Sequence, residues 1–237
     1  TDAAQKLVLL ASLAFGSAIS SDAPYKQGVD SVAPADLEFA RELGYRIKHL
    51  GIAKRDGNAL QLRVHPTLIP EEKAIAQVDG VLNAVMINAT GVGELLLVGP
   101  GAGSRPTASA VCGDLMSIAG SLARAEKPAV PSMGVPVATL DTAIIADIED
   151  VSSAWYLRLN AEDKPGVMAA LTKCLSEQGI GIESLIQKPD TSASTYVPVI
   201  ILTDTATTRS LNAAVSDIKA MPSVVGNVTR LRVENFS

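Results

Sequence analysis

WYLRLNAEDKPGVMAALTKCLSEQGI, residues 155–180, contains a strand, a turn and a helix in that order. Apolar and polar residues alternate in WYLRLNA, which is the period of a strand with one buried face. Pro165 and Gly166 mark the turn, MAALTKCLSEQGI has helical spacing, and Gly179 follows the end of that helix. This segment therefore predicts the first half of a compact α/β unit.

The segments that follow complete a six-element pattern. GIESLIQKP and TYVPVIILTD are typical of strands, TTRSLNAAVSDIKAMPSV is typical of a helix, and VGNVTRLRVENF predicts a last strand. The order β-α-β-β-α-β within about 85 residues indicates a ferredoxin-like unit. We therefore predict a ferredoxin-like domain over residues 153–237.

Residues 1–125 predict a separate α+β region with a mixed sheet. Ala3–Ser20 and PADLEFARELGY have the features of helices. Asp56-Gly57 separates two alternating stretches, which predicts a β-hairpin. IPEEKAIAQVDG predicts a short helix, and VLNAVMINATGVGELLLVG predicts two strands. Residues 126–152, rich in proline and small residues, are expected to form a linker that contains a short strand or helix.

The composition limits the possible settings. The chain of 237 residues is 47% hydrophobic and 19% charged, which supplies enough apolar material for a globular core. Its net charge of −5 and the lack of a Lys/Arg cluster argue against nucleic-acid binding. The apolar stretch after Lys6 ends at Gly16, too short for a membrane span, and a buried helix is favoured over a signal peptide. The two cysteines lie far apart in sequence and favour a reducing cytoplasm over a disulfide framework.

The stretch GPGAGSRPTASAV, residues 99–111, follows an apolar run and opens a helical segment, as a phosphate-binding loop does. It lacks the lysine of a Walker loop, and no parallel βαβ unit can be built around it. A structural turn is therefore favoured on the residues alone. His49 and His65 have no cysteine or carboxylate partners at ligand spacing, so structural roles are favoured and no metal site is predicted.

Asp2 and Lys6 are spaced to share one face of the first helix. An exposed ion pair is the favoured interpretation, because such pairs are common on helices. The alternative is a partly desolvated lysine whose pKa is lowered into the range useful for proton transfer.

Several segments agree in order and spacing with one enzyme family. The series D-AAQ-K, LAFG, GVDSV, DLEFARELGYRIKHLGIA and VDGVLNAVMINATGVGELLLVGPGAGSRPTASAV resembles homoserine dehydrogenase over nearly all of the first half. The second half resembles an ACT domain, the amino-acid-sensing module appended to longer members of that family. The resemblance implies an NAD- or NADP-dependent oxidoreductase that interconverts L-homoserine and L-aspartate 4-semialdehyde in threonine and methionine biosynthesis.

The resemblance also implies roles for individual residues. The family signature ends in Asp-x-x-x-Lys, which assigns proton transfer to Lys6 and the substrate amino group to Asp2. The GPGAG loop of the family lies beside the nicotinamide. Gly99, Gly101 and Gly103 are therefore implied to let the backbone approach NAD or NADP.

The ACT resemblance implies an effector site. In the family, the loop after the first strand binds a free amino acid together with the start of the second strand, at an interface between two ACT units. Here the loop holds Asp163, Gly166 and Val167, and the second strand starts near Ile182. L-threonine is the implied effector, and a homodimer or homotetramer is implied. The alternative is a capped turn used only for dimer contact.

The chain departs from the family in what it lacks. The Rossmann fingerprint, the upstream part of the signature, the substrate-binding glutamate region and the monovalent-cation loop are absent, and the chain begins with Thr1 rather than Met. We therefore expect the C-terminal part of the enzyme, inactive or nearly so by itself. The alternative is a non-catalytic amino-acid-binding and dimerising fragment.

Overall fold

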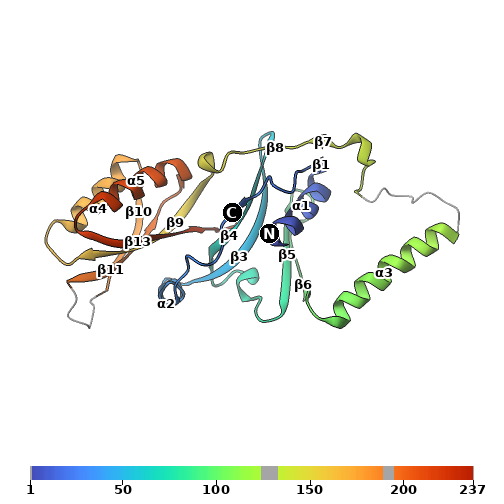
Figure 1. Cartoon of the computed structure of the whole chain (residues 1–237), viewed down its shortest axis with the longest axis horizontal. Helices are drawn as coiled ribbons and strands as arrows, with labels where there is room; N and C mark the ends of the chain where they lie inside the picture. The colour runs from blue at the N-terminus through green and yellow to red at the C-terminus, as the bar shows by residue number, and fades with distance from the viewer. Residues whose placement is uncertain (1, 124–132, 189–194, 237) are drawn as a thin grey trace.

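The computed structural model describes residues 2–123, 133–188 and 195–236 (Figure 1). It has the mixed α+β architecture that the sequence predicts. The helices are α1 (Asp2–Phe15), α2 (Pro34–Glu42), α3 (Ser104–Ala123), α4 (Val167–Glu177) and α5 (Thr208–Ala220), with short 3₁₀ helices η1 (Ala74–Gln77), η2 (Val137–Thr139) and η3 (Ile148–Asp150). The strands are β1 (Ser17–Ala18), β2 (Tyr25–Lys26), β3 (Tyr45–Asp56), β4 (Ala59–Pro70), β5 (Leu82–Ala89), β6 (Gly93–Pro100), β7 (Asp141–Thr142), β8 (Ile144–Ile145), β9 (Ser152–Glu162), β10 (Ile182–Gln187), β11 (Tyr196–Thr203), β12 (Ala206–Thr207) and β13 (Val224–Val233).

The second region has the predicted ferredoxin-like topology. Its four long strands lie in the order β10-β11-β9-β13, and helices α4 and α5 cover one face. Inward-facing aliphatic residues of both helices pack against the alternate residues of β9, including Trp155, Leu157 and Leu159. The alternation in WYLRLNA therefore reports a strand with one face buried under helices.

One nine-stranded sheet runs through both regions of the chain. The hairpin β3–β4 is antiparallel along its whole length and turns after Asp56, as predicted. Strand β13 pairs in parallel with β4, with Arg232 opposite Thr67, while β2 and β8 also pair in parallel with β4. The sequence predicted two regions but did not indicate that they share a sheet.

Helix α2 of the first region covers the other face of this shared sheet. Ala40 of α2 packs with Tyr156 and Leu231 in a buried cluster that also contains residues of β4 and β11. The N3 residue of α2, Asp36, is fully buried and accepts a hydrogen bond from the backbone N–H of Ala33 at 2.7 Å. The sheet of the second region therefore lies between its own helices α4 and α5 on one face and helix α2 of the first region on the other.

The first helix is shorter than predicted. It ends at Phe15 instead of Ser20, because Gly16 adopts a positive φ of 60° and Ser17–Ala18 then forms strand β1. Strand β1 pairs with β7, and β8 pairs with the start of β4. The described part of the predicted linker thus contains short strands and 3₁₀ helices that lie on their neighbours; its residues 126–132 fall outside the described ranges.

The hairpin β5–β6 and helix α3 form an extension with little packing of their own (Figure 1). The hairpin is a separate two-stranded sheet, and α3 has no buried residue. Many of its large apolar side chains are exposed, and the most exposed include Leu97, Met116 and Leu122. An isolated two-stranded hairpin or a single helix is only marginally stable in water, so we expect these apolar surfaces to be buried against other protein surfaces.

Candidate functional site

Asp2 and Lys6 form the predicted pair on the first turns of α1. Nζ of Lys6 lies 2.8 Å from Oδ2 of Asp2, and the two side chains are 69% and 79% exposed. The opposite face of α1 is anchored, since Ala4 and Leu7 pack on Val64 of β4. A rigid helix therefore presents a carboxylate and an ammonium together at the surface, which is the exposed ion pair favoured on spacing alone.

The GPGAG loop connects β6 to α3. A Cβ atom at Gly101 would collide with the side-chain amide of Asn83, which would then have to move. Gly103 has a positive φ of 118°, while the Cβ position of Gly99 meets nothing within 4 Å. Packing against Asn83 therefore accounts for a glycine at position 101, whereas the backbone at Gly99 is open to the approach of another group.

The loop for which an effector role is predicted, residues 163–167, connects β9 to α4. Gly166 is the N-cap of α4 and has a φ of 90°, a conformation that favours glycine, and no side chain caps the helix. The Asp163 carboxylate accepts a hydrogen bond from Nε2 of Gln187 at 2.8 Å. The Val167 side chain is buried in the core, so this residue presents only its backbone to a ligand. The loop thus offers uncapped helix amides beside one carboxylate.

Ile182 does not lie beside this loop within one chain. It pairs with Thr203 on β11, whereas the loop follows Glu162, which pairs with Tyr196 at the opposite end of β11. The strand register therefore brings Asp163, Gly166 and Val167 together and leaves Ile182 at the far end of the sheet. A single copy of the second region does not bring these two parts of the predicted site into contact.

His65 lies on β4 and is 1% exposed. Its Nδ1 lies 2.9 Å from Oγ1 of Thr67, and its Nε2 is buried with no hydrogen-bond partner in the described structure. Burial lowers the pKa of His65 to about 3, and the nearby charge of Arg232 adds to this effect. His49 is exposed, with Nε2 3.4 Å from the carbonyl oxygen of Gln27. No group of three or more metal-binding side chains occurs within the described ranges.

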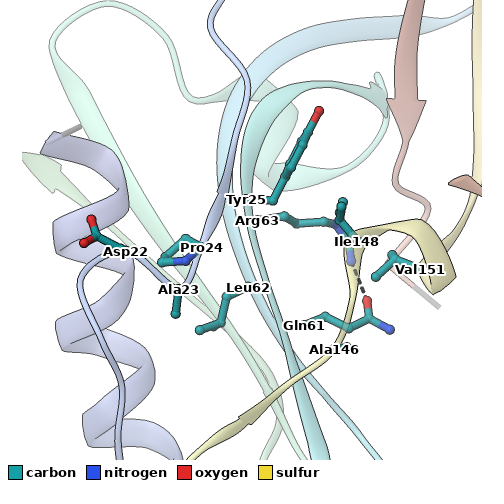
Figure 2. A pocket seen from close by; sticks show the side chains of 10 residues that line it. All are labelled: Asp22, Ala23, Pro24, Tyr25, Gln61, Leu62, Arg63, Ala146, Ile148 and Val151. Carbon is teal, nitrogen blue, oxygen red and sulfur yellow. Dashed lines mark hydrogen bonds between the residues drawn. The ribbon is translucent and has the colours of Figure 1, made fainter.

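A cavity of about 270 Å³ lies between the β1–β2 connection, β4 and the segment around η3 (Figure 2). Arg63 extends along its wall and donates to Oε1 of Gln61 at 2.5 Å and to Oε2 of Glu234 at 2.6 Å. The other lining residues are Asp22, Ala23, Pro24, Tyr25, Leu62, Ala146, Ile148 and Val151. The cavity contains none of the predicted site residues, and Glu234 already neutralises its arginine.

Sequence reasoning missed the buried polar residues where the two regions meet. Arg63 and Arg232 are both 3% exposed, yet each stands between aliphatic residues, in LRV at 62–64 and again in LRV at 231–233. A charged residue in the middle of an apolar strand was the available signal, because such a residue is rarely buried without a specific partner. Asp36 carried no such signal, since an acidic residue in a first helical turn is ordinary.

None of the helices in the described ranges is long and apolar enough to cross a membrane.

Comparison with known proteins agrees with this architecture. Residues 1–116 match the family model for homoserine dehydrogenase, and residues 155–220 match that for the ACT domain. Homoserine dehydrogenase of Pseudomonas aeruginosa is 43% identical over 236 residues, which cover 100% of this chain and 54% of that protein. Homoserine dehydrogenase of Neisseria gonorrhoeae is 38% identical over 235 residues, which cover 99% and 54%. The crystal structure of a homoserine dehydrogenase from Thiobacillus denitrificans has a TM-score of 0.91 and 41% identity, covering 100% of this chain and 53% of that one.

The fold and the matches define an α+β protein whose mixed-sheet region is joined to an ACT domain. The chain belongs to the homoserine dehydrogenase family. It spans about half the length of the curated relatives it matches.

Proposed function

We propose that this chain is the substrate-binding and regulatory part of a homoserine dehydrogenase. The complete protein interconverts L-homoserine and L-aspartate 4-semialdehyde, with NAD or NADP as the redox cofactor, in the route to threonine and methionine. The observation that carries this proposal is the Asp2–Lys6 pair, 2.8 Å apart on an anchored helix within the residues that match the family. The two free cysteines, Cys112 and Cys174, support a cytoplasmic setting.

The chemistry needs one group that moves a proton at the reacting oxygen. Oxidation of L-homoserine removes a hydride from C4 and a proton from the hydroxyl group on that carbon. Lys6 takes this proton in oxidation and returns it in reduction, and its ammonium form stabilises the developing alkoxide. Asp2 holds the Lys6 side chain in place and offers its second oxygen to the substrate amino group.

A bound nicotinamide cofactor would supply the hydride acceptor, and Gly99, Gly101 and Gly103 of this chain would form a wall of its site. Nothing lies within 4 Å of the Cβ position of Gly99, which suits the close approach of a flat ring. Gly101 belongs to the same loop, but its lack of a side chain also serves the contact with Asn83. No residue described here distinguishes NAD from NADP.

The exposed extension supports assembly with other parts. We propose that a second copy of the chain and the remainder of a longer enzyme cover β5–β6, α3 and the outer face of α1, where Leu9 is 68% exposed. Covering α1 would desolvate Lys6, which is exposed in this structure, and thereby adapt it for proton transfer. The chain alone should therefore show little or no turnover.

The ACT unit is proposed to bind L-threonine at the loop Asp163–Val167. The uncapped amides of α4 suit the carboxylate of an amino acid, and Asp163 suits its ammonium group. Because Ile182 lies at the other end of the sheet, a site that uses both requires two ACT copies in an antiparallel arrangement. This proposal supports a homodimer or a larger even-numbered assembly.

The test restores the chain to its full-length protein and follows nicotinamide absorbance with L-homoserine added. Lys6→Ala should reduce kcat at least about a hundredfold, the usual contribution of a general acid or base. The control is Lys173→Ala, because Lys173 also forms an exposed i,i+4 ion pair, with Glu177 in α4. A folded full-length protein with no activity in wild type would favour an amino-acid-binding, dimerising role. Turnover that survives in Lys6→Ala would refute the assigned proton transfer.

A further inference from the structure

The sheet of the ACT unit meets the sheet of the first region at a buried arginine. Arg232 of β13 stands opposite Thr67 of β4 on one side and opposite Trp155 of β9 on the other. The residue is 3% exposed. Its side chain therefore lies in the interior at the place where the two regions become one sheet.

The Arg232 guanidinium lies over two aromatic rings. Its central carbon is 4.3 Å from the ring centroid of Trp155 and 5.3 Å from that of Tyr25. One terminal nitrogen donates to Oγ1 of Thr208 at 2.9 Å, and Nε is buried with no hydrogen-bond partner in the described structure. Arg232 forms no ion pair with a carboxylate within the described ranges. The rings and one hydroxyl group thus replace a counter-ion.

This arrangement is sensitive to the relative position of the two regions. A buried cation is costly unless its favourable contacts are kept, and the cation–π contacts of Arg232 come from different parts of the chain. Trp155 belongs to the ACT unit, whereas Tyr25 belongs to strand β2 of the first region. A shift of one ring relative to the other would remove a contact from the cation. Tyr25 is also one of the residues that line the cavity of Figure 2.

Both rings are connected to proposed sites by continuous structure. Trp155 lies on β9, which runs directly into the loop Asp163–Val167. Tyr25 pairs with Arg63 on β4, and the neighbouring residue of β4, Val64, packs against α1. Thr208 begins α5, whose inner face packs in the same core as α4. Arg232 therefore stands between the effector loop and the helix that carries Lys6.

We propose that Arg232 couples occupancy of the loop Asp163–Val167 to the conformation of α1 and β4. When the Trp155 ring moves, the Arg232 guanidinium keeps its contact with that ring and loses its contact with the Tyr25 ring. This inference rests on the proposed effector site. Binding that moves β9 alters the stacking of Arg232, because close-packed interiors respond by discrete rearrangement instead of gradual strain. Arg232 is a positioning residue and does not touch substrate or effector.

The experiment uses the 237-residue chain with L-threonine as the probe. Calorimetry measures binding of L-threonine. The fluorescence emission of Trp155, the only tryptophan in the sequence, reports changes around Arg232, and amide hydrogen exchange reports the opening of α1. The test variant is Arg232→Gln. The control is Arg230→Gln, because Arg230 lies two positions away on β13 and is exposed. Tyr25→Leu removes the ring from the first-region side and leaves the ACT core intact, so it serves if Arg232→Gln does not fold.

In wild type and in Arg230→Gln, L-threonine should release heat, shift the Trp155 emission and change α1 exchange by about fivefold or more, the lower end of typical coupling. In Arg232→Gln and in Tyr25→Leu the heat should remain and the response of α1 should disappear. A response of α1 that survives both variants, or heat in wild type without any response of α1, overturns the coupling role. No heat in wild type overturns the effector site itself and removes the basis of this inference.

Discussion

Asp36 and Arg158 lie 122 residues apart in the sequence, and Nε of Arg158 donates to Oδ1 of Asp36 at 2.5 Å. The same carboxylate accepts hydrogen bonds from the hydroxyl of Tyr156 at 2.9 Å and from a terminal nitrogen of Arg158 at 3.1 Å. Burial and the adjacent carboxylate raise the pKa of Tyr156, so the tyrosine stays a neutral donor. One fully buried carboxylate of the first region thereby holds the ACT sheet in place.

Removing the charge of Asp36 should therefore destabilise both regions together. Asp36→Asn leaves Arg158 without its counter-ion, and loss of one partner from a buried pair costs about 3 kcal/mol. Urea unfolding followed by Trp155 fluorescence and by far-ultraviolet circular dichroism measures the change, and the two probes should report one common transition.

The matched control is Glu42→Gln, which breaks the exposed ion pair between Lys188 and Glu42. That change should lower the free energy of unfolding by less than about 1 kcal/mol. Equal effects of the two substitutions, or separate transitions in wild type, would contradict the role given to Asp36.

The free energy of unfolding should decrease as the pH falls, because His65 is buried with a lowered pKa. In the unfolded chain this histidine takes up a proton near its ordinary pKa of 6.5, whereas in the folded chain its pKa is about 3. Between these values the unfolded state binds more protons, so the free energy of unfolding decreases as pH falls, by up to about 1.4 kcal/mol per pH unit. His65→Gln should reduce this slope between pH 6.5 and pH 5, a window set by the same pKa shift.

Urea titrations across this pH range make the measurement. His49→Gln is the control, because His49 is exposed and its substitution should leave the slope unchanged. A His65→Gln protein with the full wild-type slope would show that carboxylates alone produce the acid sensitivity.

Gly166 should be intolerant of a side chain. Its φ of 90° is unfavourable for any other residue, so Gly166→Ala should lower the free energy of unfolding by about 1 kcal/mol or more. Gly99→Ala is the control, since nothing lies within 4 Å of its Cβ position, and it should change stability by less than about 0.5 kcal/mol. The measurement is the thermal unfolding midpoint of each variant compared with that of the wild type. Equal midpoints would mean that the loop relaxes without cost.

Lys6 should matter for catalysis and not for folding. The exposed pair with Asp2 contributes at most about 0.5 kcal/mol to stability, so Lys6→Ala in the 237-residue chain should unfold almost as wild type does. Chemical denaturation measures this difference. A loss of several kcal/mol would assign Lys6 a structural role and would undermine the kinetic test on the full-length protein.

Local patterns predicted most of the elements. The alternation in β9, the turn before α4 and the hairpin at Asp56-Gly57 all appear where they were expected, because turn chemistry and side-chain periodicity act over a few residues. The end of α1 was misplaced at Ser20, since a positive φ at Gly16 ended the helix before the run of small residues did.

The candidate sites divide in the same way. Asp2 and Lys6 meet because i,i+4 spacing on a helix brings any such pair together. Asp163, Gly166 and Val167 are also near in sequence, since all three belong to the short connection from β9 into the start of α4. The place of Ile182 depends on how β10, β11 and β9 are paired, and residue spacing carries no information about that register.

The local pattern of the chain was enough to predict the elements of the βαββαβ unit, the turn of the long hairpin and the acid–lysine pair, since each of these depends on residues close together in sequence. The pairing of β13 with β4, the burial of Asp36 against β9 and the stacking of Arg232 on Trp155 and Tyr25 appear only in the folded structure. These contacts join residues far apart in the sequence, and even the pair with the shortest separation, Trp155 and Arg232, lies on the first and last strands of the βαββαβ unit. Their free energy comes from packing and desolvation, which arise only when distant segments come together.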